Sequence, residues 1–342
     1  MPDQIKLSRR TIMLMPLALA ACKSGTSLFK LSGMTMGTTY NVVAVDVPSD
    51  IKETQVQAAI DTALAQVNRQ MSNWDASSEI SRFNAANGSA PMEISPELAE
   101  VMHAAETVHI ASEGRFDTTM GPLIELWGFG APGARELPAD AQIEQAQARS
   151  GHGNTLKVGS RQLQKTQDDA QVYLSAIGKG FGADHVGRAI EKLGITDYMV
   201  EIGGDLYASG RNAEGQPWRI GVETPEAHTR GVLDVVGVSG VGLASSGDYR
   251  NYFEVDGQRF SHVIDPATGR PITHKTASAT VVAPNAMLAD AWATAMLILG
   301  RERGMEIAAA QNLAVLFVER DSEADHLSFK TTASPSFAKL TA

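Results

Sequence analysis

The sequence is poor in three features that would each point to a class of protein. It has one cysteine, Cys22, so it forms no intrachain disulfide and builds no metal site from several thiolates. It has no excess of basic residues, because 39 Asp and Glu outnumber 29 Lys and Arg, and this argues against a nucleic-acid-binding surface. Beyond the N-terminus, no apolar run is long enough to predict a membrane-spanning helix.

The N-terminus has the pattern of a secretory signal, with basic residues before a short apolar run at 11–21 and then Cys22. The hexapeptide LALAAC (17–22) resembles a bacterial lipobox. It predicts cleavage before Cys22, lipidation of its sulfur, and anchoring on the periplasmic side of a bacterial membrane, either inner or outer. The segment SRRTIM (8–13) also resembles a twin-arginine export signal. The alternative is an ordinary secretory signal with an incidental cysteine.

Composition and hydrophobic periodicity predict a globular α+β protein. Hydrophobic residues make up 43% and charged residues 20%, and 342 residues suffice for one large or two ordinary domains. The second half has an α/β-like character, and Asn285 is a candidate N-cap for a helix that Gly300 ends. We predict helices over 54–71, 95–114, 139–149, 182–194 and 286–300, a hairpin over 252–264, a strand within 27–47, and strands within 172–178, 197–210, 218–223, 233–247, 279–283 and 314–320.

The segment LADAWATAML (288–297) places two polar residues in an otherwise apolar helix. Asp290 and Thr294 are four residues apart, so they lie on the same face, one turn apart. Because burying an unpaired carboxylate is costly, Asp290 needs a partner. A carboxylate and a hydroxyl suit Mg²⁺, which takes oxygen ligands and often shares substrate phosphates. The alternative is a paired core aspartate and a threonine that bonds back to its own helix.

The segment SAIGKGFGADHVGRAI (175–190) combines small residues with the start of a helix. Such a segment lets the backbone approach a ligand closely and offers N–H groups to a phosphate, and Lys179 adds positive charge. The spacing of Gly178, Gly180 and Gly182 matches neither a Walker A loop nor a dinucleotide fingerprint. An ordinary glycine-rich turn is the alternative.

Other candidate residues lie next to predicted turns or stand alone among polar residues. His262 follows the hairpin, and it either donates to a phosphate and carries a proton or is structural. Asp265 and Asp205 are interpreted first as turn residues that bond the backbone, with ligand contact as the alternative for Asp205. Trp74 and Phe116 are candidates to flank a planar ring, but isolated aromatic residues are usually part of the core.

Seven segments, taken in order, resemble the signature blocks of the ApbE family, the FAD:protein FMN transferases. They extend from about residue 33 to 320, and an ordered set of this kind is far more specific than any one block. A lipoprotein signal is also typical of this family. The segments are MGTTYNV (36–42), MSNWDASSEISRFN (71–84), FDTTMGPLIELWGFG (116–130), SAIGKGFGADHV (175–186), GGDLYASG (203–210), SSGDYRNYFEVDGQRFSHVIDPATGRPI (245–272) and DAWATAMLILG (290–300).

The resemblance implies an ApbE-type fold, in which mixed or antiparallel sheets are flanked by helices in a T-fold-like arrangement. It also implies a division of the chain. We expect a signal peptide over 1–21, a tether over 22–32, a single FAD-binding FMN transferase domain of one or two lobes over 33–325, and a C-terminal tail over 326–342.

The resemblance further implies an activity. Members of the family cleave the pyrophosphate of FAD and transfer FMN to a Thr or Ser hydroxyl of a partner protein, with release of AMP and a requirement for Mg²⁺. Their acceptors are flavin-carrying subunits of membrane redox complexes. Two alternatives remain: a periplasmic FAD-binding or flavin-donor protein of a respiratory maturation pathway, and a Mg²⁺-dependent FAD pyrophosphatase.

At matching positions, the resemblance assigns roles to individual residues. His262 and Asp290 are the catalytic candidates, with His262 beside the phosphates as proton carrier or phosphate donor. The implied ligands of Mg²⁺ are Asp290, Thr294, the carbonyl of Ala176 and a further carbonyl, that of Ala293 or Ala291.

Contacts with FAD are implied mainly for residues of the first half of the chain. Tyr173 stands where the family often has Asp, a departure that bears on one flavin or ribityl contact. The implied contact residues are Met36, Trp74, Arg115, Phe116, Asp117, Lys179 and Ile264.

Overall fold

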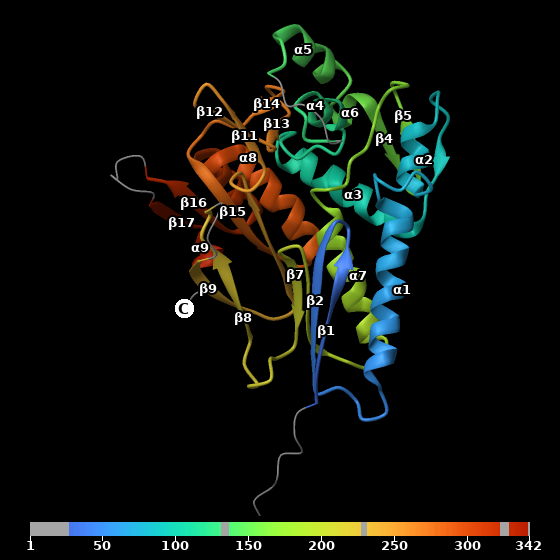
Figure 1. Ribbon diagram of the computed structural model, residues 1–342, viewed down its shortest axis with the longest axis vertical. Helices are drawn as coiled ribbons and strands as arrows, with labels where there is room; N and C mark the ends of the chain where they lie inside the picture. Colours follow the sequence, from blue (N-terminus) through green and yellow to red (C-terminus); the bar gives the residue numbers. More distant parts are fainter. Residues whose placement is uncertain (1–26, 131–136, 227–230, 322–327, 341–342) are drawn as a thin grey trace, which may run out of the picture.

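The protein is built around one long antiparallel sheet (Figure 1). The computed structural model describes residues 27–130, 137–226, 231–321 and 328–340. Each strand of the sheet runs antiparallel to its neighbours, which confirms the α+β class but replaces the α/β-like character expected for the second half. In spatial order the strands are β1 (Leu28–Thr35), β2 (Thr38–Val45), β6 (Asp197–Ile202), β7 (Asp205–Ser209), β10 (Val241–Gly247), β15 (Thr276–Ala283), β16 (Ala314–Arg320) and β17 (Phe329–Ala333).

Helices cover one face of this sheet, and a hairpin with a short helix covers the other (Figure 1). α1 and α7 pack against β2 and β6, while α8 packs against β10 and β15. All eight residues of β15 are buried, as expected for a strand with both faces covered. The helical face has α1 (Glu53–Met71), α3 (Pro96–Ala111), α7 (Gly178–Glu191) and α8 (Ala286–Gln311), and the other has β8 (Trp218–Glu223), β9 (Val232–Val238) and α9 (Pro335–Ala338).

Smaller elements gather at one end of the main sheet, at the top of Figure 1. Trp127, Ile143 and Ile264 belong to an apolar cluster that joins some of these elements, while others pack on the main core through residues such as Phe83 and Leu163. These elements are α2 (Glu79–Ala85), α4 (Gly121–Leu126), α5 (Asp140–Ala148), α6 (His152–Thr155), the sheet β3-β5-β4 (Met92–Glu93, Gln162–Lys165, Leu156–Gly159), and the hairpins β11–β12 (Tyr252–Val255, Gln258–Ser261) and β13–β14 (Ile264–Asp265, Arg270–Pro271).

Elements with a strong local signal are present close to their predicted bounds. The predicted helix at 95–114 is α3, and Ser95 caps it by accepting a hydrogen bond from the Leu98 amide. The hairpin turns at Asp256 and Gly257, both with positive φ, as the sequence pair predicts. α7 begins at Gly178 rather than at 182, because the glycine-rich segment predicted as a turn is the first turn of the helix.

The last long helix is interrupted where the sequence predicts its end. Asn285 caps α8 through a 2.8 Å hydrogen bond from the Leu288 amide. Gly300 leaves helical geometry, with φ 70° and ψ 172°, and a second helical stretch then continues to Gln311.

The strand predicted over 172–178 is wrong. Its backbone is satisfied largely by side-chain amides, which take the place of a neighbouring strand. Asn84 accepts from the Val172 amide at 2.8 Å and donates to the Val172 carbonyl at 2.9 Å. Asn73 donates to the same carbonyl at 2.7 Å and accepts from the Leu174 amide at 3.2 Å. Apolar, β-branched residues made the segment resemble a strand, but the pattern could not reveal which groups bind its backbone.

We expect Asn84→Ala to lower the free energy of unfolding by about 2 kcal/mol, because it removes both of its hydrogen bonds to Val172 and leaves the Val172 amide without a partner, while the carbonyl keeps its bond from Asn73. Urea unfolding measures this loss. Asn87→Ala is the matched control, since Asn87 is an exposed asparagine that follows shortly after the same helix. Equal stability of the two variants would contradict the role of Asn84 in holding this segment.

The sheet extends beyond the predicted domain bounds at both ends. Residues 28–32, predicted as part of a tether, lie in β1 and pair with β2. β17 and α9 lie inside the predicted tail, where β17 pairs with β16 and Phe337 is fully buried. The predicted signal peptide and Cys22 lie outside the described residues. Within the described ranges, no helix combines the length and apolar character needed to span a membrane.

Candidate active site where α7 meets α8

α7 and α8 meet at their N-terminal ends with unusually close backbone contact. A Cβ atom on Gly180 would lie 2.2 Å from the carbonyl oxygen of Ala286, so only glycine permits this approach. One turn further along α7, the Asp184 carboxylate accepts hydrogen bonds of 2.8 Å from the amides of Ala286 and Met287. Asp184 thus binds the otherwise unpaired N–H groups at the start of α8 and fixes the two helices to one another.

This junction places Asp290 against the first turn of α7. The Asp290 side chain is buried, with 3% of the residue exposed, and its Oδ2 accepts a 3.1 Å hydrogen bond from the Gly180 amide. The same oxygen lies 3.7 Å from the Lys179 ammonium. Burial raises the pKa of Asp290 above its ordinary value, and the positive charge of Lys179 opposes that shift. The predicted carboxylate therefore does lie in a buried polar site.

Asp205 is a second buried carboxylate at the same place, which corrects its interpretation as a simple turn residue. It begins β7, is 3% exposed, and forms a close ion pair with Lys179. Burial and the negative charge of Asp290 raise the pKa of Asp205 to about 7. Burial alone would lower the pKa of Lys179, but the attraction of both carboxylates outweighs burial and raises it.

The oxygen atoms around Asp290 are of the kind that bind a hard cation such as Mg²⁺. In a regular helix the Gly180 amide would donate to the carbonyl of Ala176, but here it donates to Asp290. Among the described residues, no hydrogen bond to the Ala176 carbonyl is present, so this oxygen remains available as a ligand. Thr294 lies one turn beyond Asp290, and its hydroxyl is 3.1 Å from that of Ser246 on β10.

The remaining predicted ligand, Ala293, is fully buried within α8, where its carbonyl also accepts the hydrogen bond of the helix. The described residues contain no group of three or more His, Cys, Asp or Glu side chains arranged to hold a metal. An oxygen site here would therefore depend on one or two carboxylates, a hydroxyl, backbone carbonyls and substrate phosphates.

The β1–β2 turn lies over the same end of α7. Met36 occupies this turn with φ 49°, and its side chain covers Gly182, where an added Cβ would come within 2.9 Å of the methionine methyl carbon. Thr38 and the side chain of Lys179 both approach Gly203, in the turn before Asp205. The structure thus brings together two of the predicted FAD contacts, Met36 and Lys179, beside Asp290.

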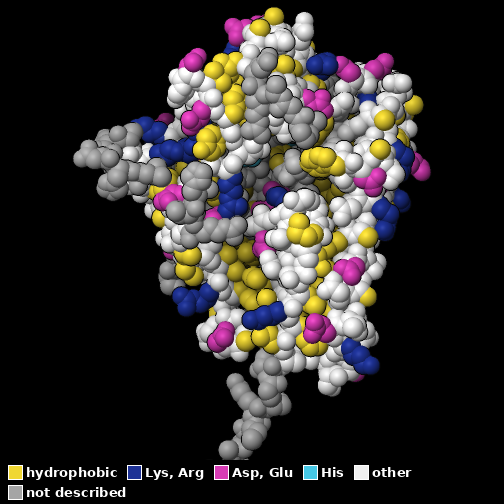
Figure 2. All heavy atoms as spheres, in the orientation of Figure 1, with side chains coloured by type: hydrophobic (Ala, Val, Ile, Leu, Met, Phe, Trp, Pro, Cys, Tyr) yellow, Lys and Arg dark blue, Asp and Glu magenta, His cyan; other side chains and the backbone are white. Residues whose placement is uncertain are grey.

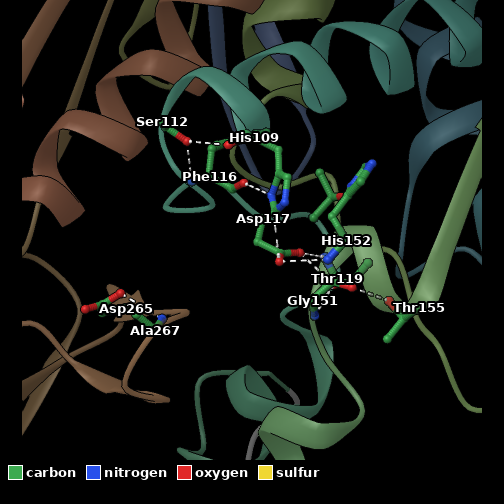
Figure 3. A network of polar contacts seen from close by, with 11 residues as sticks. His109, Ser112, Phe116, Asp117, Thr119, Gly151, His152, Thr155, Asp265 and Ala267 are labelled. Atoms are coloured by element: carbon green, nitrogen blue, oxygen red, sulfur yellow. Dashed lines mark hydrogen bonds and ion pairs between the residues drawn. The ribbon is translucent and has the colours of Figure 1, made fainter. Parts of the chain in front are cut away.

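Asp117 is held in a network of polar contacts after α3 (Figure 3). One carboxylate oxygen accepts from the amide and hydroxyl of Thr119 at 2.7 and 2.6 Å. The other accepts from the His152 amide at 2.9 Å and lies 3.9 Å from His109 Nδ1. The His109 and His152 rings stack with centroids 5.1 Å apart. Because both of its carboxylate oxygens are engaged in this network, the role that best suits Asp117 is to fix the conformation of the loop that follows α3.

Sequence reasoning missed both histidines, because His109 lies within a helix and His152 within a variable-looking segment, and neither lies in a recognisable motif. His109 Nδ1 also lies 2.8 Å from the carbonyl of Phe116, so α3 holds the loop at two points. Burial lowers the pKa of His152, whose Nε2 has no hydrogen-bond partner among the residues that the structure describes.

The other predicted FAD contacts differ widely in exposure. Arg115 forms an ion pair of 2.5 Å with Asp265, which also accepts from the Ala267 amide and so is the expected turn residue. Ile264 is buried next to it. Phe116 is 1% exposed within the core, so its ring is not free to stack on a flavin, whereas Trp74 is 78% exposed.

His262 lies at the end of the hairpin β11–β12 and is exposed. Its backbone amide donates to the carbonyl of Asn251 at 3.0 Å, and its Nδ1 lies 3.1 Å from the same oxygen. If Nδ1 donates this hydrogen bond, the neutral ring carries its lone pair on Nε2. That tautomer is the one a proton acceptor needs.

Charged side chains of both signs are scattered over the face shown in Figure 2, with no single basic patch.

Comparisons with known proteins agree in one family. The model of the ApbE family matches residues 36–317. The chain is 42% identical over 334 residues to the FAD:protein FMN transferase of Haemophilus influenzae, which covers 96% of this chain and 95% of that one. Its fold resembles that of the flavin transferase ApbE from Vibrio cholerae, with a TM-score of 0.84 and 39% identity over 92% of this chain and 99% of the other. The flavinyl transferase ApbE of Pseudomonas stutzeri gives a TM-score of 0.83 at 33% identity, over 92% and 97% of the two chains.

Proposed function

Since this chain belongs to the ApbE family and is a transferase that flavinylates proteins, we propose that it moves FMN from FAD to a Thr or Ser hydroxyl of a partner subunit and releases AMP. The observation that carries this proposal is the buried Asp290 carboxylate beside Lys179 and the Gly180 amide. These groups suit a metal ion and a pyrophosphate, which are the charged partners that the reaction requires.

The metal would be held by the Asp290 carboxylate, the Thr294 hydroxyl and the Ala176 carbonyl, with the Ala293 carbonyl as a further candidate. Bound there, Mg²⁺ would neutralise phosphate oxygens and stabilise the AMP leaving group. Lys179 adds a positive charge at the first turn of α7, and the Gly180 amide of that turn points toward the same site. FAD would extend from here past Met36 toward Trp74 and the loop at 115–117, with Ile264 next to that loop.

The transfer itself needs a nucleophile and a place for its proton. The acceptor hydroxyl attacks the phosphorus on the FMN side, the bond to the AMP oxygen breaks, and the hydroxyl proton is released. We assign that proton to His262 Nε2, because Asp290, as a metal ligand, is poorly placed to act as a free base. The acceptor is a flavin-carrying subunit of a membrane redox complex.

The proposal is tested by incubating the purified protein with FAD, Mg²⁺ and a candidate acceptor, then measuring acceptor mass and AMP. The expected result is a mass gain equal to FMN less one water, with stoichiometric AMP. AMP without a mass gain would identify an FAD pyrophosphatase, and bound FAD with neither product would identify a flavin carrier. Either of these two outcomes would overturn transfer.

We expect His262→Ala to lower the transfer rate by about 10²–10⁴-fold, the range for loss of a general acid–base group. Because His262 is exposed and its ring is not part of the core, the variant should retain wild-type thermal stability. His103→Ala is the control, since His103 is an exposed histidine on α3. Unchanged transfer by His262→Ala would remove His262 from the mechanism.

We also propose that the protein is anchored by lipid on the periplasmic side of a bacterial membrane through Cys22. Cys22→Ser should then move the protein from the membrane fraction to the soluble fraction, because no lipid can attach to serine at this position. Fractionation followed by immunoblotting measures this, and the transfer rate of the soluble variant should match wild type. Continued membrane association would argue against the lipobox interpretation.

A further inference from the structure

One side chain at the α7–α8 junction already places a positive charge at the proposed metal site. The Lys179 ammonium lies between two buried carboxylates, in close contact with Asp205 and 3.7 Å from Asp290 Oδ2. Both Asp205 and Asp290 are 3% exposed, so each carboxylate is largely removed from water. An ammonium and a divalent cation are therefore alternative partners for Asp290 within one small space.

We propose that Asp205 is a positioning residue that holds the Lys179 ammonium away from Asp290, and thereby keeps the Asp290 carboxylate available to Mg²⁺. This inference rests on the proposed function, because it takes Asp290 to be the metal ligand. The set of metal ligands inferred above does not include Asp205. Asp205 therefore acts on the metal site through Lys179.

The contacts support this role. Lys179 approaches Asp205 more closely than Asp290, so its charge is shared unequally between the two. Asp290 has a second donor in the Gly180 amide, which fixes its carboxylate independently of the lysine. Two carboxylates and one ammonium together carry one net negative charge, which leaves the site attractive to a cation even with Lys179 in place.

The turn before Asp205 holds this residue firmly enough to keep the Lys179 ammonium in place. Asp205 follows Gly203 and Gly204, which both have positive φ, at 57° and 100°. The Gly204 amide donates to the Glu201 side chain at 2.6 Å, and the Lys179 side chain packs against Gly203, with its Cδ 3.3 Å from where a Cβ would lie. The turn therefore fixes both the carboxylate and the stem of the lysine that it binds.

Without Asp205, Asp290 is the only buried carboxylate among the described residues that remains near the Lys179 ammonium. The ammonium would move onto Asp290 and compete directly with a divalent cation. Replacing the lysine instead would leave two carboxylates without an ammonium, which favours Mg²⁺. The two substitutions are thus expected to change Mg²⁺ affinity in opposite directions.

The test is a titration of Mg²⁺ by isothermal calorimetry, once without nucleotide and once with ADP. The proteins compared are wild type, Asp205→Asn, Lys179→Met and the double variant. We expect Asp205→Asn to weaken Mg²⁺ binding at least tenfold and Lys179→Met to strengthen it several-fold. In the Lys179→Met background, Asp205→Asn should have less than a threefold effect, because there is no ammonium left to hold.

Asp234→Asn on β9, which packs on the other face of the sheet, controls for the loss of one negative charge. Thermal melts check that each variant is folded, and affinity rather than activity is the readout because Lys179 is itself a proposed FAD contact. Unchanged Mg²⁺ affinity in Asp205→Asn would overturn the inference alone. An equal loss in both backgrounds would make Asp205 a direct ligand, which also overturns it. A wild-type protein that takes up no Mg²⁺ in either condition would overturn the metal site and this inference together.

Discussion

Replacing Asp290 by alanine is expected to abolish Mg²⁺-dependent transfer, with a loss on the order of 10³-fold or more. Asp290 is the only carboxylate in the proposed ligand set, and it is held in place by the Gly180 amide. Without it, the site keeps only neutral oxygen donors, and Lys179 remains paired with Asp205. Transfer rates measured over a range of Mg²⁺ concentrations should show a loss that added metal does not restore.

Glu302→Ala is the matched control, because Glu302 is a carboxylate on the same helix whose side chain is 88% exposed. The control should retain the wild-type rate and the wild-type Mg²⁺ requirement. If Asp290→Ala also retained full activity, the metal site would have to lie elsewhere.

Gly180→Ala is expected to be damaging despite the small change. The added Cβ would lie 2.2 Å from the carbonyl oxygen of Ala286 and 2.6 Å from its carbonyl carbon, both backbone atoms that cannot rotate away. Overpacking of this kind costs about 1–3 kcal/mol, and here relief requires α7 and α8 to separate. The variant should lose stability in urea unfolding, and it should bind Mg²⁺ more weakly, because separation of the helices displaces Asp290 from the Gly180 amide.

Gly178→Ala provides a stringent comparison in the same helical turn. A Cβ on Gly178 would meet only the Cβ of Leu174, at 3.9 Å, which is ordinary van der Waals contact. Alanine also favours helix over glycine by about 1 kcal/mol, so this variant should be as stable as wild type or more so. Similar behaviour of the two alanine variants would show that helix propensity, and not close approach, decides the outcome at Gly180.

The sequence predicted best those features that depend on neighbouring residues in the chain. Asn285 was identified as a helix cap, and the hairpin with its Asp256–Gly257 turn was located, because cap and turn preferences act over a few residues. The shared face of Asp290 and Thr294 followed from helical pitch alone. Burial of Asp290 was also foreseeable, since the residues around it are apolar.

Features created by contacts between distant segments could not be predicted in this way. Asp205 lies 26 positions from Lys179 in the chain, and no local pattern pairs them. The hydrogen bonds from Asn73 and Asn84 to the segment at 172–174 span 88 to 101 positions. Resemblance to a family supplied roles for some of these residues, but not the contacts that hold them.

The segment that carries Ala176 has its position set largely by two asparagine side chains, together with one backbone hydrogen bond from the Tyr173 amide to the Thr118 carbonyl, instead of by a strand ladder. A strand in the main sheet could not shift without breaking hydrogen bonds along its whole length. This segment can shift when a single asparagine changes, and the eight-stranded sheet is left intact. Point substitutions can therefore change the position of the Ala176 carbonyl, a proposed metal ligand. The geometry of the metal site can thus diverge during evolution while the eight-stranded sheet that supports it is retained.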